Sequence, residues 1–262
     1  MSERTTILVD TDGAVAIITL NRPQRRNAID HTMRIELADA ISDAMAERAV
    51  RALVITGAGG AFSGGGDIST MTPSPAADAR PRLLLARRVI EEIWRGPKPV
   101  VAAVEGAAAG AGLALALACD RMVAGAGATF TASFVRVGLA GDWGISASLP
   151  ARIGRHAAKQ MMMFGDPVDA DTALSLGIVD TVTEAGDALR RATEDAHRLA
   201  AGPSEALRTM KAALNAWPRD AFTVLDEEID TQSALFETAD FAEAVDAFAT
   251  RRTPVFGKDQ DC

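Results

Sequence analysis

The chain has 262 residues, of which 48% are hydrophobic, and its formal net charge is −8. This length and apolar content fit one large domain, or a domain with a smaller appended part. The negative charge argues against nucleic acid as a partner, because phosphate contacts need clustered Lys and Arg side chains. The two cysteines form no Cys-x-x-Cys motif, so we expect neither a disulfide framework nor a cysteine-based metal site.

No targeting or membrane signal is visible along the chain. Residues 1–6 are polar and lack the apolar core of a signal peptide. No uninterrupted apolar run reaches the ~18 residues of a membrane span. We therefore expect a cytoplasmic protein without membrane contact.

The first half alternates short apolar runs with helical patterns. Expected strands occupy residues 14–20, 52–56, 100–104 and 120–124. Expected helices occupy residues 30–47, with Asp30 as the cap, and 82–95, after a proline-rich polar segment over 71–81. Repeated strand, glycine turn and helix units predict parallel strands with right-handed crossovers.

The second half is almost entirely helical in pattern. Expected helices occupy residues 185–201, 204–216, 221–237 and 239–251. The one strand-like piece there is Gly177-Ile178-Val179-Asp180. We therefore expect an α/β core over residues 1–200 and a helical part over 201–262.

Two glycine clusters are the most informative feature of the chain. One is Ala61-Phe62-Ser63-Gly64-Gly65-Gly66-Asp67, and the other is Glu105-Gly106-Ala107-Ala108-Ala109-Gly110-Ala111-Gly112, which leads into a helical stretch. Glycine lets bare backbone N–H groups face a ligand, and a helix N-terminus adds partial positive charge. Two such turns facing one point are suited to hold a developing oxyanion.

Several motifs appear in an order that resembles the crotonase (enoyl-CoA hydratase/isomerase) superfamily. They are Leu20-Asn21-Arg22-Pro23 with Arg26-Asn27-Ala28, Val54-Ile55-Thr56-Gly57, both glycine clusters, Lys98-Pro99 before the third strand, Gly165-Asp166-Pro167, Leu176-Gly177-Ile178-Val179 and Arg252-Thr253-Pro254-Val255-Phe256-Gly257-Lys258. The resemblance covers nearly the whole chain. It implies an α/β fold built as a crotonase-like spiral of ββα units, acyl-CoA thioester substrates and no separate cofactor. It also implies a homotrimer or dimer of trimers, with the CoA site in residues 1–200 and a trimerisation region in 201–262.

The resemblance assigns roles to individual positions. The oxyanion hole of the family falls on the backbone N–H groups of Gly66 and Ala111. Arg25 and Arg26 match basic positions near the CoA phosphates, and Asp67 and Ile68 match the adenine pocket. Gly64, Gly65 and Gly110 belong to the glycine turns around the thioester. Phe256 and Lys258 match a C-terminal stretch that touches CoA, sometimes on a neighbouring subunit.

Departures from the family pattern bear on the chemistry. Hydratases of the family carry two glutamates that position water, and Ala114 and Phe134 stand at those positions here. Hydration needs a base for the water and an acid for the α-carbon, so its usual route is lost. One acid remains: Asp142, in Val137-Gly138-Leu139-Ala140-Gly141-Asp142-Trp143-Gly144, resembles the proton-shuttling aspartate of family isomerases.

These positions predict a 1,3-proton shift from 3-enoyl-CoA to 2-enoyl-CoA through Asp142. An apolar pocket containing Phe134 and Trp143 should raise the pKa of Asp142 by desolvation. Asp142 also resembles the nucleophilic aspartate of 4-chlorobenzoyl-CoA dehalogenases, although Glu91 stands where those enzymes have a helper histidine. Hydrolysis or dehalogenation through Asp142, family hydration, and CoA-thioester binding without turnover therefore remain open alternatives.

Overall fold

The computed structural model describes residues 4–71, 75–216 and 221–257. Its centre is a six-stranded sheet of β1 (Ile7–Asp12), β2 (Val15–Leu20), β3 (Ala52–Gly57), β4 (Val100–Val104), β6 (Arg121–Gly125) and β9 (Thr181–Thr183), in that spatial order. β1 and β2 form an antiparallel pair, and all other neighbours pair in parallel. The mostly parallel sheet predicted from the glycine-turn units is thus confirmed.

A second, smaller sheet stands beside the first. It contains β5 (Ala107–Ala109), β7 (Thr129–Thr131) and β8 (Val168–Asp169), in that order. The helix α3 (Ala111–Ala118) follows β5 almost directly, and all its residues are buried. The N-terminus of α3 therefore lies at the junction of the two sheets.

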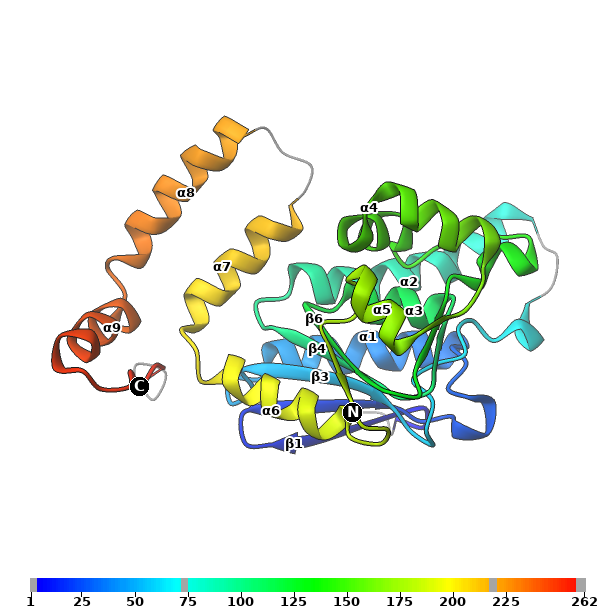
Figure 1. Cartoon of the computed structure of the whole chain (residues 1–262), viewed down its shortest axis with the longest axis horizontal. Helices are drawn as coiled ribbons and strands as arrows, with labels where there is room; N and C mark the ends of the chain where they lie inside the picture. Colours follow the sequence, from blue (N-terminus) through cyan, green and yellow to red (C-terminus); the bar gives the residue numbers. More distant parts are fainter. Residues whose placement is uncertain (1–3, 72–74, 217–220, 258–262) are drawn as a thin grey trace.

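Helices cover both faces of the large sheet (Figure 1). Alternate strand residues point to opposite faces, so Val54, Val101 and Val123 pack with alanines of α6 (Ala188–Ala200). Their neighbours Ile55 and Ala102 pack on the other side, in the large core shared with α1 (His31–Ala46), α2 (Ala76–Arg95) and α3. The remaining helices are α4 (Ile145–Phe164), α5 (Ala170–Leu176), α7 (Ser204–Asn215), α8 (Ala221–Leu235) and α9 (Ala239–Thr250), with short 3-10 turns at Pro23–Arg25, Ile68–Thr70 and Ser133–Val137.

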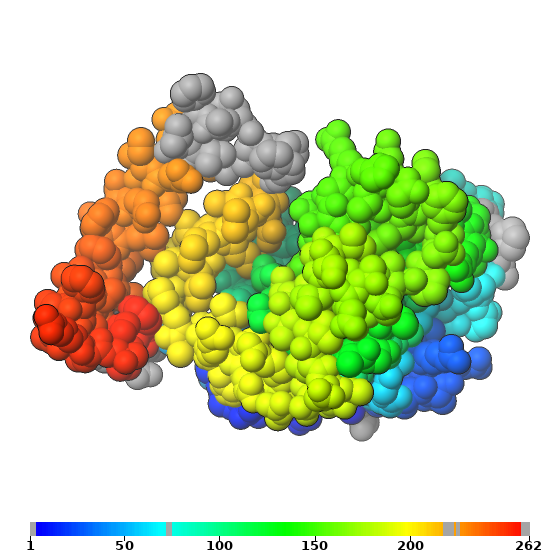
Figure 2. Space-filling view, viewed as in Figure 1, coloured from blue at the N-terminus to red at the C-terminus, as the bar shows by residue number. Residues whose placement is uncertain are grey.

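Helices α7, α8 and α9 form an arm beside the body of the molecule (Figures 1 and 2). Large apolar side chains remain exposed along it, among them Leu214 at 80% and Phe248 at 88%. In the described part of the chain, no helix is long and apolar enough to cross a membrane.

Three sequence expectations differ from the structure. α2 begins at Ala76 rather than at residue 82 and contains Pro81 in its second turn, where proline removes one backbone hydrogen bond of the helix. The strand expected at Gly177–Asp180 lies at Thr181–Thr183, after a helix that ends on a left-handed Gly177. β1 was not predicted, since it is an edge strand of which only Ile7 is buried.

Candidate active site

Asn27 organises the first glycine loop. Its side chain is fully buried, donates to the carbonyls of Ala58 (2.8 Å) and Ala61 (2.7 Å), and accepts from the backbone N–H of Arg22 (2.9 Å). Its φ is +53°, a left-handed conformation that asparagine tolerates better than most residues. The sequence motif that contains Arg22 and Asn27 therefore holds the loop that precedes Gly66.

The two glycine clusters lie against each other. The Ser63 N–H donates to the carbonyl of Ala107 (2.9 Å), and the Ala109 N–H donates to the carbonyl of Ser63 (2.9 Å). A Cβ on Gly65 would lie 2.6 Å from the Ala109 carbonyl oxygen and 3.5 Å from the Ala111 nitrogen, and φ at Gly65 is +93°. Only glycine fits this close approach, which brings the Gly66 segment beside the start of α3.

The backbone N–H groups of Gly66 and Ala111 have no hydrogen-bond acceptor among the described residues at this junction. Ala111 is the first residue of α3, where N–H groups have no partner within the helix, and Gly110 before it makes the turn with φ +51°. Two free donors next to a helix N-terminus can stabilise an oxyanion.

Arg26, Asp67 and Ile68 border the first cluster in different ways. Gly64 N–H donates to the Arg26 carbonyl (2.7 Å), which places exposed Arg25 and Arg26 beside the glycines. The Asp67 carboxylate is already engaged: it accepts from Arg22 (3.0 Å) and from the Ser69 hydroxyl (2.6 Å). Ile68, by contrast, is 59% exposed.

Asp142 sits in a loop of unusual backbone geometry. Its neighbours Gly141 (φ +119°), Trp143 (+53°) and Gly144 (+74°) all have positive φ. For a bulky residue such as Trp143 this conformation is strained, and strain of this kind concentrates at functional sites. A Cβ on Gly144 would lie 2.7 Å from the ring of Trp94, so packing against α2 helps to fix the loop.

The Asp142 carboxyl is half-buried and its Oδ1 atom, fully covered, has no hydrogen-bond partner. Burial raises the pKa of Asp142, and the nearby guanidinium groups of Arg34 and Arg82 partly oppose that rise. Phe134 and Trp143 are both buried, as the apolar pocket predicted from the sequence requires. The expected direction of the pKa shift is confirmed.

Arg34 was missed by sequence reasoning. It is only 3% exposed, and its Nη2 atom lies 4.0 Å from the position that a Cβ on Gly66 would occupy. The signal was present in the sequence, since Arg34 falls three residues before Leu37 and seven before Ile41, on the apolar face of the predicted helix.

Other positions named from the sequence have different surroundings. Ala114 is fully buried within α3. Glu91 pairs with Arg87 (2.7 Å) and lines a cavity together with Trp143 and Gly144. A Cβ on Gly257 would touch Arg51, which directly precedes β3. The neighbouring Phe256 is therefore at the opposite end of the strand from the glycine clusters. Lys258 lies outside the described residues.

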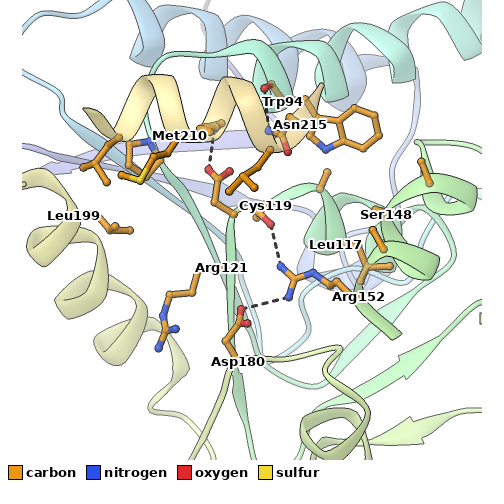
Figure 3. A pocket seen from close by; sticks show the side chains of 18 of the residues that line it. Trp94, Leu117, Cys119, Arg121, Ser148, Arg152, Asp180, Leu199, Met210 and Asn215 are labelled. Carbon is orange, nitrogen blue, oxygen red and sulfur yellow. Dashed lines mark hydrogen bonds and ion pairs between the residues drawn. The ribbon is translucent and has the colours of Figure 1, made fainter. Parts of the chain in front are cut away.

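A cavity of about 910 Å³ lies away from the glycine clusters, and Figure 3 shows the side chains that line it. It lies at the far end of α3, where Arg152 donates to the Cys119 carbonyl (3.1 Å) and Lys211 pairs with Asp120 (2.7 Å). Burial raises the pKa of Cys119 to about 12, so its thiol is unreactive. These groups satisfy one another and serve the junction of the core with α7. In the described part of the chain, no cluster of three His, Cys, Asp or Glu residues could hold a metal ion.

Comparison with known proteins agrees with this geometry. The family described as "Enoyl-CoA hydratase/isomerase" matches residues 10–260. A probable enoyl-CoA hydratase of Rhodobacter capsulatus is 36% identical, over 96% of this chain and 97% of the relative. A 1,2-epoxyphenylacetyl-CoA isomerase of Escherichia coli is 32% identical, over 95% and 97%. The crystal structure of a putative enoyl-CoA hydratase from Streptomyces coelicolor superposes with a TM-score of 0.93 at 35% identity, over 98% of this chain and 96% of that one.

These relatives carry hydratase and isomerase names, so the comparisons do not favour an isomerase over a hydratase. They do agree on the fold, a crotonase-like α/β architecture, and on acyl-CoA thioesters as the substrate class. The chain belongs to the enoyl-CoA hydratase/isomerase family.

Proposed function

We propose that this protein is an enoyl-CoA isomerase that moves a double bond from the 3-position to the 2-position of an acyl-CoA. One observation carries the proposal: Asp142, unlike the paired Asp67, has a buried carboxyl oxygen without a partner. Ala114 and Phe134 stand at the positions where family hydratases carry glutamates. One carboxylate suits a proton shift, whereas hydration also needs a group that activates water.

The reaction would proceed in two steps. The Asp142 carboxylate takes a proton from C2 of the 3-enoyl-CoA, and the electron pair moves to the thioester oxygen to give a dienolate. The N–H groups of Gly66 and Ala111 stabilise that oxyanion, each worth about 2.7–4 kcal/mol by analogy with other oxyanion donors. The protonated carboxyl then returns the proton to C4, and the double bond forms between C2 and C3.

The raised pKa of Asp142 supports this role. A carboxylate at its ordinary pKa is a weak base toward a thioester α-proton, and a higher pKa brings it closer to the working range. Burial is the largest cause of the raised pKa, and the guanidinium groups of Arg34 and Arg82 partly oppose it.

We propose that the CoA part lies across the first glycine cluster. The exposed residues Arg25 and Arg26 would meet the phosphates, and exposed Ile68 would offer an apolar contact to the adenine. Asp67 contributes by shape rather than by its carboxylate, which is paired within the chain. Phe256 would reach CoA only from a neighbouring subunit, through a trimer or dimer of trimers built on the exposed apolar side chains of α7, α8 and α9.

The test is turnover of 3-enoyl-CoA and 2-enoyl-CoA in parallel by the wild type, Asp142→Asn and Asp166→Asn. Asp166 is an exposed acid that pairs weakly with Arg136 at 3.5 Å, so its variant controls for the loss of one charge. We expect isomerisation to fall by about 10²–10⁴-fold in Asp142→Asn and to persist in Asp166→Asn.

Other outcomes separate the remaining candidates. Rapid hydration of 2-enoyl-CoA by the wild type would contradict the proposal and favour the hydratase names of the relatives. Trapping of an acyl group on Asp142 would identify it as a nucleophile of hydrolysis or dehalogenation. Binding without turnover of either thioester would leave a CoA-thioester binding protein.

A further inference from the structure

Unpartnered polar atoms gather around the acyl side of the candidate site. Within the described residues, the buried side-chain atoms that lack a hydrogen bond are Arg34 Nε, Arg51 Nε, Arg82 Nε, Asp142 Oδ1 and Trp143 Nε1. All but Arg51 belong to the Asp142 loop or to the helices α1 and α2 that face it. A buried donor or acceptor without a partner lowers stability, so such a concentration is expected where a ligand supplies the partners.

One member of this group, Arg34, lies close to the first glycine cluster. It comes from α1, is almost completely buried, and reaches the Gly66 segment with its Nη2 atom. No carboxylate of the described residues lies within 4.0 Å of its guanidinium. Asp30, one helical turn before it, is occupied by Arg22 (3.2 Å) and by the N–H of Met33 (2.8 Å).

Arg82 and Trp143 extend the donor set from other elements. Arg82 projects from α2 and acts electrostatically on both Arg34 and Asp142. Trp143 directly follows Asp142 in the sequence, and its buried indole Nε1 has no hydrogen-bond partner. Arg34 and Arg82 therefore lie close enough to Asp142 to act on it electrostatically, yet among the described residues neither forms an ion pair or hydrogen bond with its carboxyl.

A plain hydrocarbon acyl chain cannot satisfy these donors. Its one acceptor is the thioester oxygen, and the N–H groups of Gly66 and Ala111 already account for that atom. Binding such a chain would leave the buried guanidinium of Arg34 against hydrocarbon without a partner, which is costly for a charge. An acyl group with another oxygen would instead receive charge-assisted hydrogen bonds.

We propose that the acyl site selects thioesters whose acyl group carries a second acceptor oxygen, which Arg34 binds beside Arg82 and Trp143. The position of Arg34 next to Gly66 places this oxygen within the first few carbons of the thioester. The inference rests on the proposed function only in assigning the acyl group to the space between Gly66 and Asp142. It makes Arg34 a specificity determinant, whichever reaction Asp142 performs.

The experiment measures binding of CoA thioesters that differ only in acyl oxygen. Butyryl-CoA has no further oxygen, acetoacetyl-CoA adds a neutral carbonyl, and succinyl-CoA adds a carboxylate on a chain of the same length. Isothermal titration gives the Kd of each for the wild type, Arg34→Met, Arg34→Lys, Arg82→Gln and Arg88→Gln. Arg88 also lies on α2, but it forms an exposed ion pair with Asp39 (2.7 Å), so its variant is the matched control.

We expect the wild type to bind acetoacetyl-CoA or succinyl-CoA at least about tenfold more tightly than butyryl-CoA. Whichever of the two is preferred identifies the oxygen as neutral or anionic. The preference should disappear in Arg34→Met, decrease in Arg34→Lys and Arg82→Gln, and persist in Arg88→Gln. If Arg34→Met does not fold, the preference in Arg34→Lys and Arg82→Gln still decides the question.

Equal affinity of the wild type for all three thioesters would overturn the inference. So would an equal loss of affinity for all three in the Arg34 variants, because that would assign Arg34 to the scaffold or the CoA part. The binding ratio does not depend on turnover. Failure of the isomerase assay with a preserved, Arg34-dependent ratio would therefore refute the proposed reaction and leave this inference standing.

Discussion

Asp67 and Asp142 lie in two different loops of the candidate site, and their carboxyl groups have opposite surroundings. Asp67 is held by Arg22 and Ser69, which lower its pKa. Asp142 has a covered oxygen without a partner, and burial raises its pKa. The contrast separates structure from chemistry: a carboxylate whose bonds are complete within the chain holds a loop, whereas one that is left incomplete is available to a substrate.

The same contrast extends to the two loops as wholes. Around Asn27 the buried polar side chains are hydrogen-bonded and shape the first glycine cluster. Around Asp142 the backbone has positive φ at Trp143, and the buried N–H donors of Arg34, Arg82 and Trp143 lack hydrogen-bond partners.

The largest effect is expected for Gly65→Ala. The new Cβ would meet the Ala109 carbonyl oxygen at 2.6 Å, so the Gly66 and Ala111 N–H groups would be pushed apart. We expect kcat for the isomerisation to fall by about 10²–10³-fold, as when an oxyanion donor is removed. Gly60→Ala is the control, because Gly60 also has positive φ (+77°) but no atom within 4 Å of its added Cβ. Equal losses in both variants would mean that backbone strain alone is responsible.

A smaller effect, on stability, should distinguish the two aspartates. Asp67→Asn removes a buried charge-assisted pair with Arg22, so we expect the free energy of unfolding to fall by about 1.5–3 kcal/mol. Asp142→Asn removes a carboxylate that burial penalises, so its stability at neutral pH should be unchanged or higher. Urea unfolding of both variants measures this difference. A large loss of stability in Asp142→Asn would show that Asp142 is a structural residue.

The smallest effect is a pH dependence, and its sign differs between the two residues. Asp142 must be ionised to act as a base, so kcat/KM should rise with pH through its raised pKa, above the usual range near 3.9. Folding stability due to Asp142 should decrease over that same rise, because the folded state holds its proton more tightly. The stabilising pair of Asp67 has the opposite sign: it is complete above the ordinary pKa of Asp and is lost as pH falls through the lowered value. A kcat/KM profile without an acid limb above pH ~4 would contradict the role of Asp142.

Much of the site could be predicted because its parts are local in the sequence. The strands were visible as apolar runs, and Gly65 and Gly110 marked turns where a side chain does not fit. The two glycine clusters predicted an oxyanion site, and the family resemblance assigned its donors to Gly66 and Ala111. In the structure the clusters meet through the bridge between Ser63 and Ala108.

The sequence by itself determined the family, the order of the strands' apolar runs and the acid Asp142, because each depends on residue type and spacing along the chain. Only the tertiary structure decided that Arg34 and Arg82 accompany Asp142, since they come from two helices that are distant in the sequence and packed together. It also decided that Asp67 is engaged by Arg22, 45 residues away. Pairing and burial set the charge state of a carboxylate, and both arise only when separate segments are brought into contact.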